Sequence, residues 1–182
     1  ALIACRKEAA WSNGVLKTYI QRDGLDRRDA ALAVRLCYGV LQNRNRLDFY
    51  LGQLSNTKLK NLHPAVRDIL HLGLYQLLDM DKIPSSAAVN ESVILAKKYC
   101  KKFYNAPAFV NAVLRNFIRN KDKLEEPQTL SDRYSHPQPL VDLLKAYVGE
   151  PRLEKMLEAN NRATPTVAQV NTVATDMESL IN

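Results

Sequence analysis

Residues 84–119 read PSSAAVNESVILAKKYCKKFYNAPAFVNAVLRNFIR, and this stretch decides the fold. Apolar residues recur every three or four positions in each half of it, which predicts two consecutive helices. In the first half the apolar stripe comprises Val89, Val93, Ala96 and Cys100. In the second half it comprises Val110, Val113, Leu114, Phe117 and Ile118. Two amphipathic helices in succession indicate a helical bundle.

Both predicted helices have start signals and basic residues near their ends. Ser85 and Ser86 are candidate N-caps after Pro84, and Pro107 suits the first turn of the second helix, where its missing N–H costs nothing. The basic residues at the end of the first helix are Lys97, Lys98, Lys101 and Lys102. They suit the negative end of the helix dipole. The second helix has a polar stripe made of Asn111, Arg115 and Arg119.

The composition of the chain indicates a folded protein with reduced thiols. Its 182 residues leave room for one ordinary domain, or one domain and part of another, and 46% of them are hydrophobic. The three cysteines are far apart in the sequence and form no CxxC pair, so neither a disulfide framework nor a zinc site is expected. No apolar run approaches the ~20 residues that span a bilayer, and we expect a cytoplasmic protein without membrane or metal partners.

Positive charge is concentrated in one part of the chain. The net charge is +7, but residues 1–126 carry 21 basic and 12 acidic residues, whereas residues 127–182 carry 5 and 7. Eight basic residues and one acidic residue lie within 97–123. Such clustering is typical of a surface that binds polyanions, although a solvated helix surface gives the same pattern.

Further helices are predicted before residue 84. Residues 2–20 have a helical apolar face with Gly14 as a weak point or a break. Trp11 is interpreted as a core or helix-packing residue, base stacking being the rarer alternative. Asp29 is a plausible cap for the next helix, after a turn rich in Asp and Gly.

Polar residues within this helical region have two interpretations. Arg44 and Arg46 follow the second predicted helix, either as solvated residues or as contacts to backbone phosphates. The most hydrophobic helix begins at His63-Pro64 and is expected at the centre of the bundle. His71 lies inside it without a second ligand at metal-binding spacing, so we interpret it as a satisfied core or boundary residue.

The composition changes after residue 119. Residues 121–137 are rich in charge and proline and are predicted to form a linker. Two helices are expected around 140–147 and 153–157, and residues 166–172 alternate like a strand before a last helix at 176–181. We therefore predict a domain at 1–120, a linker at 121–137, and a small incomplete α+β segment at 138–182.

The chain contains no recognisable catalytic motif. Its six glycines are scattered and form no phosphate-binding loop. Cys37 and Cys100 lie on apolar helix faces and are interpreted as small core residues rather than nucleophiles. Glu125 and Glu126 fall in the predicted linker, where a solvated role is expected. Catalytic, cofactor-binding and metal-binding residues are therefore predicted to be absent from this chain.

A family resemblance joins these observations. IPSSAAVNESVILAK, followed by FVNAVLRNFIR, is similar to the RNA-binding helical domain shared by NusB-type antitermination factors and bacterial ribosomal-RNA methyltransferases. The matching motifs are Val-Asn-Glu at 89–91 and Asn-Ala-Val-Leu-Arg at 111–115. Residues 134–182 resemble the entry into the catalytic half of the RsmB/Sun family of ribosomal-RNA (cytosine-5-)-methyltransferases. One departure is Gln169, which stands where that family usually has an arginine.

This resemblance implies an all-α, NusB-like bundle that places ribosomal RNA against a catalytic domain of the same polypeptide. It also implies that the intact enzyme uses S-adenosylmethionine, that its two cysteines and glycine-rich loop lie further along, and that this chain alone is inactive. The basic residues expected to contact RNA phosphates are Lys97, Lys98, Lys101, Lys102, Arg115, Arg119, Arg44 and Arg46.

Two other functions fit the same residues. One is a free-standing NusB-type antitermination factor, and the other is a protein-docking module whose basic helix ends only maintain solubility. Individual residues also have structural alternatives. Arg115 could pair with Glu91 or Asp122, and Asn111 could be a buried residue that bonds to the backbone.

Overall fold

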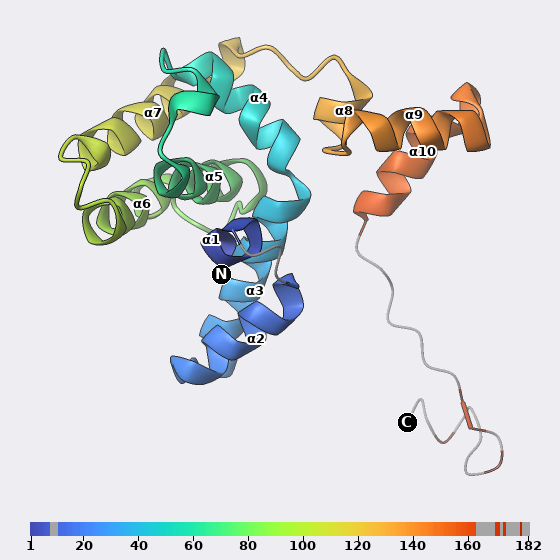
Figure 1. The fold of residues 1–182 in the computed structure, drawn as a ribbon, viewed down its shortest axis with the longest axis horizontal. Coiled ribbons are helices and arrows are strands. Elements are labelled where there is room, and N and C mark those ends of the chain that lie inside the picture. Colours follow the sequence, from blue (N-terminus) through green and yellow to red (C-terminus); the bar gives the residue numbers. More distant parts are fainter. Residues whose placement is uncertain (8–10, 163–169, 172, 174–178, 180–182) are drawn as a thin grey trace.

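The computed structural model of the chain describes residues 1–7, 11–162, 170–171, 173 and 179. Its α-helices are α1 (Leu2–Lys7), α2 (Ser12–Arg22), α3 (Arg27–Gln42), α4 (Arg44–Leu54), α5 (Pro64–Asp79), α6 (Ser85–Tyr99), α7 (Ala106–Asn120), α8 (Leu130–Arg133), α9 (Gln138–Val148) and α10 (Glu150–Asn161). Two short 3₁₀ turns are η1 (Leu59–Asn61) and η2 (Lys121–Lys123). No strand occurs among the described residues, which confirms the all-α prediction (Figure 1).

Helix α5 lies at the centre of the bundle, as its all-round hydrophobicity predicts. It packs against α6, α7, α3, α4 and α1, and it begins at the expected His63-Pro64 pair. Leu70 and Leu74 on α5 are completely buried. Glycine at position 73 permits a close approach, because a Cβ there would lie 2.6 Å from the Cδ1 atom of Leu114. A larger residue would separate α5 from α7.

Helices α6 and α7 bury most of the apolar stripes that the sequence predicts, but Ile118 near the end of α7 is 39% exposed, which corrects its place on the buried face. Val89, Ala96 and Cys100 of the first stripe are buried, as are Val110 and Leu114 of the second. The predicted serine caps are wrong. Pro84 occupies the N-cap position and Ser85 is already helical, with no side-chain hydrogen bond capping the helix.

The N-terminal region differs from the single helix expected over 2–20. Helix α1 ends at Lys7 and α2 begins at Ser12, so Gly14 lies within a helix rather than at a break. Trp11 is 89% exposed, which corrects its assignment to the core. It is the N-cap residue of α2 and has an extended backbone, so it stands outside the helical repeat.

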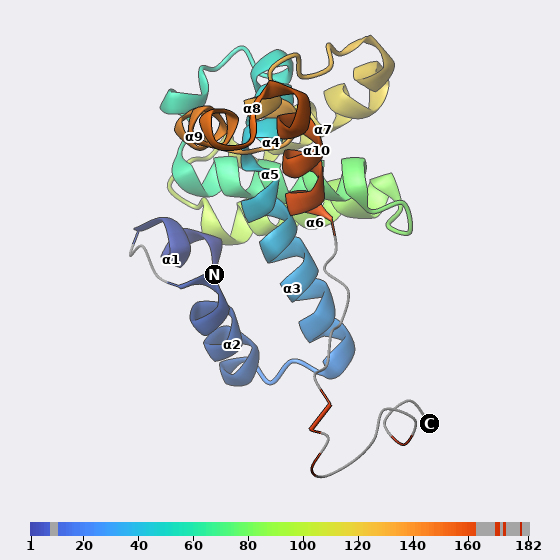
Figure 2. The ribbon, with the colours of Figure 1, turned by 90° about the vertical axis from the view of Figure 1, so that its right-hand side faces the viewer.

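Helices α2 and α3 form a hairpin that projects from the bundle (Figure 1, Figure 2). The N-cap of α3 is Asp26, whose side chain accepts a hydrogen bond from the Asp29 backbone N–H. The expectation that Asp29 caps this helix is therefore wrong by one turn. The C-terminal half of α3 contributes the buried residues Cys37 and Val40, so only this half is anchored in the core.

Helices α8, α9 and α10 form a second, smaller unit with its own apolar cluster (Figure 2). Val141, Leu153 and Leu157 are its buried residues. This unit contacts α4, where the Asn45 side-chain amide donates to the His136 carbonyl oxygen at 3.3 Å. The two helices expected around 140–147 and 153–157 are confirmed. The strand expected at 166–172 and the helix at 176–181 lie outside the described residues, apart from isolated positions.

Residues 121–137, predicted to be a linker, include η2 and α8 and make specific contacts. Glu126 accepts a hydrogen bond of 2.6 Å from the Tyr50 hydroxyl, which corrects the expectation of a purely solvated role. Gln53 pairs with the backbone of Glu125 through two hydrogen bonds of 2.9 and 3.1 Å. These contacts attach the segment to α4.

None of the helices in the described ranges is long and apolar enough to cross a membrane.

Candidate nucleic-acid interface

The predicted lysines gather where α6 ends. Lys97 and Lys98 lie in the last turn of α6, and Lys101 and Lys102 lie in the turn that leads to α7. All four side chains are exposed. Helix α6 ends at Tyr99. Cys100 is its C-cap residue and donates its backbone N–H to the Ala96 carbonyl. The exposed helix C-terminus is a favourable place for positive charge.

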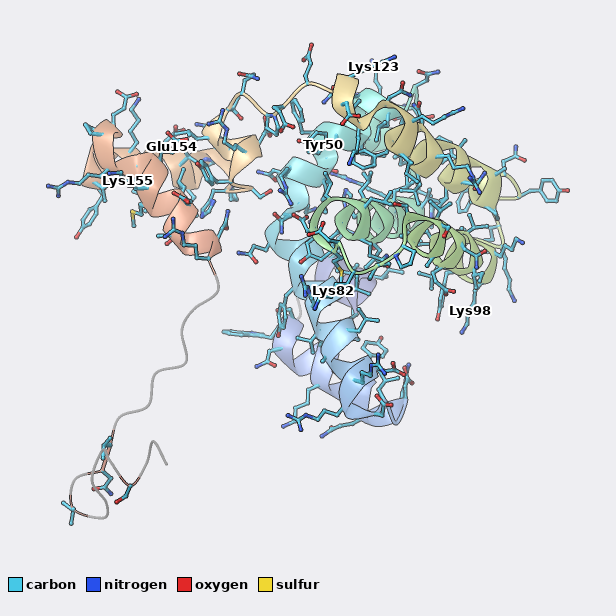
Figure 3. The ribbon with its side chains drawn as sticks, turned by 180° about the vertical axis from the view of Figure 1, so that it is seen from behind. Tyr50, Lys82, Lys98, Lys123, Glu154 and Lys155 are labelled. Atoms are coloured by element: carbon cyan, nitrogen blue, oxygen red, sulfur yellow. The ribbon has the colours of Figure 1, made fainter. Side chains whose placement is uncertain are left out.

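None of these four lysines forms an ion pair in the part of the chain that the structure describes, although the charge of Lys98 is close enough to Asp23 to help lower the pKa of that carboxyl, after its main partner Arg22. The ion pairs found there involve other cations, mostly arginines. The Nζ atom of Lys98 instead lies 5.4 Å from the ring centroid of Tyr99, a cation–π contact. Figure 3 shows Lys98 at the end of the bundle that lies away from Glu154 and Lys155 of α10. We call Lys97, Lys98, Lys101 and Lys102 the lysine patch.

Arg115 and Arg119 lie on the outer face of α7, apart from the lysine patch. Both are exposed, and with Asn111 they border a shallow hollow. The Nε atom of Arg115 donates to the Asn111 Oδ1 atom at 3.0 Å, and neither predicted carboxylate partner bonds to Arg115. At 1.5 Å per residue, Arg119 lies about 20 Å along the helix from its start beside the lysine patch. The structure therefore places the predicted residues in separate groups.

Arg44 and Arg46 occupy the first turn of α4 and differ in environment. Arg46 pairs with Asp79 at 2.5 Å, and its side chain is only 25% exposed. Its charge is therefore compensated within the protein. Arg44 is exposed and borders a small cavity near Arg6 and Asp68. Their contact with RNA remains a prediction, as does that of the other basic residues.

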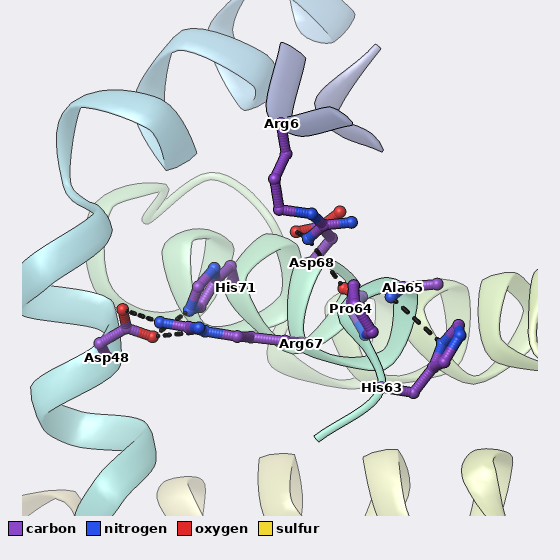
Figure 4. A network of polar contacts seen from close by, with 8 residues as sticks. All are labelled: Arg6, Asp48, His63, Pro64, Ala65, Arg67, Asp68 and His71. Carbon is purple, nitrogen blue, oxygen red and sulfur yellow. Dashed lines mark hydrogen bonds and ion pairs between the residues drawn. The ribbon is translucent and has the colours of Figure 1, made fainter. Parts of the chain in front are cut away.

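A polar network connects α4, α5 and α1 (Figure 4). Asp48 accepts hydrogen bonds from Arg67, whose Nε atom lies 2.9 Å from Oδ1, and from the His71 Nε2 atom, also at 2.9 Å. Because His71 is 2% exposed and hydrogen-bonded, its interpretation as a satisfied core residue is confirmed. Burial tends to raise the pKa of Asp48, but the hydrogen bonds from His71 and Arg67 outweigh it and lower that pKa.

The second carboxylate of this network, that of Asp68, has a pKa shifted in the opposite direction. Asp68 accepts a hydrogen bond of 2.7 Å from Arg6, which also donates to the Pro64 carbonyl at 3.2 Å. Burial nevertheless raises the pKa of Asp68 above its ordinary value. The Arg6–Asp68 ion pair joins α1 to α5, and the Arg67–Asp48 pair joins α5 to α4. Both pairs position helices of the bundle.

A group of aromatic residues that was not among the predicted site residues lies beside the lysine patch. Tyr99 is 58% exposed, Phe103 is 42% exposed and Tyr104 is 95% exposed. They lie on either side of Lys101 and Lys102 in the sequence YCKKFY, at residues 99–104. Interleaved aromatic and basic residues are typical of nucleic-acid-binding surfaces, and this motif could have identified them. Lys58 and Lys60, around η1, were missed as well.

Comparison with known proteins relates this geometry to a family. Residues 1–119 match the sequence profile of the NusB family. The chain is 33% identical over 187 residues to the probable ribosomal RNA small subunit methyltransferase B of Bacillus subtilis, covering 100% of this chain and 41% of that protein. It is 38% identical over 146 residues to the ribosomal RNA small subunit methyltransferase B of Vibrio cholerae, covering 79% and 33%. The corresponding Synechocystis protein is 30% identical over 161 residues, covering 86% and 36%.

These similarities confirm both resemblances that the sequence motifs predict. The chain spans well under half the length of the curated relatives that it matches.

Proposed function

The chain belongs to the NusB family, and from that membership we propose that its helical bundle binds RNA through the lysine patch. The observation that carries this proposal is that none of the four exposed lysines forms an ion pair within the described residues. Arg46, by comparison, is paired with Asp79. Unpaired lysines can exchange their counterions for those of a nucleic-acid backbone, which releases ions and favours binding.

Lysine contacts of this kind give affinity and orientation. Lysine is a flexible point charge with no fixed fork of donors, so it contacts phosphate oxygens without distinguishing bases. We expect Arg115 and Arg119 to extend the phosphate-binding surface along α7, because both are exposed and neither pairs with a carboxylate among the described residues. Arg44 is a further candidate, and Arg46 would have to exchange Asp79 for a phosphate.

The names of the relatives extend the proposal to a longer protein. We propose that residues 1–120 position small-subunit ribosomal RNA for a cytosine-C5 methyltransferase domain of the same polypeptide, that residues 121–137 link the two parts, and that residues 138–182 begin the methyltransferase part. The intact enzyme would act in the cytoplasm with S-adenosylmethionine. No glycine-rich loop that fits this cofactor occurs in the chain, so no catalytic step is assigned to its residues.

Charge reversal with a matched control tests the RNA-binding proposal. The double variant Lys98→Glu/Lys102→Glu reverses two charges of the lysine patch. The control Lys82→Glu/Lys155→Glu makes the same change outside the patch, at exposed lysines of the α5–α6 turn and α10 that form no ion pair in the described ranges. Affinity for a single-stranded fragment of ribosomal RNA is measured by fluorescence anisotropy across a range of salt concentrations.

The expected results follow from counterion release. Loss of two phosphate contacts reduces the slope of log affinity against log salt by about 1.4 on a single strand. The patch variant should show this reduction together with weaker binding, and the control should match the wild type. Binding that is indifferent to salt, or equally weakened in both variants, would contradict the role of the lysine patch.

A further inference from the structure

A hollow beside the lysine patch has the composition of a base-binding site. It has a volume of about 620 Å³ and lies between the segment before α5 and the turn before α7. This volume is within the ~300–1,000 Å³ typical of small-molecule pockets. The residues that border it are Thr57, Asn61, Leu62, His63, Pro64, Val66, Phe103, Tyr104, Asn105, Ala106 and Phe109. No acidic residue is among them.

Aromatic side chains provide a stacking surface in this hollow. The ring of Phe103 lies 4.2 Å from that of His63, centroid to centroid, at a tilt of 38°. One side of the Phe103 ring is thus supported, and the residue remains 42% exposed. Tyr104, next in the chain, is 95% exposed and has no partner in the described part of the protein. Every nucleobase offers a flat π-face that can stack on such rings.

Unpaired polar groups in the hollow match the edges of a base. Asn105 occupies the N-cap position of α7, yet its side chain makes no capping hydrogen bond, although asparagine is a preferred capping residue. The Asn61 amide likewise makes no hydrogen bond within the described residues. The Nδ1 atom of His63 accepts from the Ala65 backbone N–H at 3.3 Å, and its Nε2 atom makes no hydrogen bond within the described residues (Figure 4).

The charge around the hollow favours an RNA chain over a peptide as the occupant. Both segments that border the hollow carry exposed lysines next to its lining residues: Lys58 adjoins Thr57, Lys60 adjoins Asn61, and Lys102 adjoins Phe103. Lys101 of the lysine patch adds a fourth positive charge. A nucleic-acid strand could therefore bind phosphates on both sides while one base enters between them.

We propose that this hollow binds an unpaired base of single-stranded RNA, stacked against Phe103 and Tyr104. This inference rests on the proposed RNA-binding function and adds a preference for single strands to it. A paired base cannot enter, because its faces are stacked and its edge is occupied within the duplex. The lysine patch would bind either form of RNA through phosphates, whereas the hollow would distinguish between them.

The test uses the whole chain with two RNA probes of equal length, one single-stranded and one a blunt duplex. The single strand contains 2-aminopurine, whose fluorescence is quenched when it stacks. The variants are Tyr104→Ala and Phe103→Leu, and the matched control is Tyr147→Ala, which removes a ring that is 87% exposed on α9. Circular dichroism verifies that each variant is folded.

The expected result is a loss of affinity for the single strand of about 5- to 100-fold in Tyr104→Ala, from the contribution of one stacked base. The quenching should be reduced in both Tyr104→Ala and Phe103→Leu, while duplex affinity and the control stay unchanged. If the wild type binds RNA with a steep salt dependence but the aromatic variants bind the single strand equally well, the hollow is not a base site and the lysine patch stands. If the wild type binds neither probe, the proposed function itself is wrong.

Discussion

Replacement of Asp48 by alanine is the sharpest test of how the bundle is held together. The Asp48 carboxylate accepts two hydrogen bonds from Arg67 and one from His71, and its side chain is 19% exposed. Removing it leaves His71, which is 2% exposed, without its partner and leaves Arg67 with an uncompensated charge. Arg67 and Asp48 lie on different helices, so the substitution weakens the contact between α5 and α4.

The size of the effect follows from burial. Breaking a fully buried ion pair costs about 3–5 kcal/mol. The Arg67 side chain is 25% exposed and can recover part of its hydration. We therefore expect the free energy of unfolding to fall by about 2–4 kcal/mol, which is a decrease in Tm of roughly 5–15 °C for a chain of this size. Urea and thermal unfolding followed by far-UV circular dichroism measure both quantities.

The matched control is Asp122→Ala, which removes an exposed carboxylate in η2 that has no ion-pair partner among the described residues. Such a surface substitution should change stability by less than about 0.5 kcal/mol. If Asp48→Ala costs no more than this control, the network does not stabilise the bundle and the reasoning fails.

The dependence on pH provides an independent check. The pKa of Asp48 is lowered in the folded protein, so its contribution is present above the pKa of the unfolded state, about 3.9, and is lost as the pH falls through the folded value. The stability difference between wild type and Asp48→Asn should be full near pH 6 and shrink below about pH 4. Asp68 has a raised pKa and therefore the opposite slope, but both proteins contain it, so it cancels in the difference.

Further predictions concern packing and the attachment of the second unit. Gly73→Ala should lower the free energy of unfolding by about 1–3 kcal/mol in urea titrations, because its Cβ would overlap Leu114, whereas Gly52→Ala on an open helix surface should raise it by up to about 1 kcal/mol. Tyr50→Phe removes the hydrogen bond to Glu126, so limited proteolysis between residues 125 and 136 should be faster than in the wild type. Burial and Glu126 also raise the pKa of Tyr50, so the wild type should lose more stability than Tyr50→Phe as the pH rises above about 10, as measured by urea unfolding.

The helical core could be predicted from sequence because its signal is periodic and local. The apolar stripes of α6 and α7 predict core positions for Ala96 and Val110, and both are buried. The apolar residues all around α5 predict its central position. Burial of apolar surface decides these positions, and a 3.6-residue repeat records it directly. Trp11 shows the limit of this rule. Its large apolar side chain predicts a core position, but the residue stands at the N-cap of α2 and not within the helical repeat.

The partners of polar residues could not be predicted in the same way. Arg46 pairs with Asp79, 33 positions away, and Tyr50 bonds to Glu126, 76 positions away. No local pattern encodes such pairs, because they depend on which helix faces are brought together. Arg115 is different, because its partner Asn111 lies one turn before it on the same polar stripe, and neither alternative partner, Glu91 or Asp122, bonds to it.

The clustered charges of the lysine patch repel one another in the folded protein. Like charges placed close together repel, by a few tenths of a kcal/mol per pair on a helix surface. Arg46 and Arg67 offset such costs by pairing with Asp79 and Asp48, which also joins helices. The four lysines form no ion pair within the described residues, so they do not join helices in this way. An external polyanion would remove the repulsion, and the exposed rings of Phe103 and Tyr104 beside the patch favour RNA as that polyanion over an acidic protein.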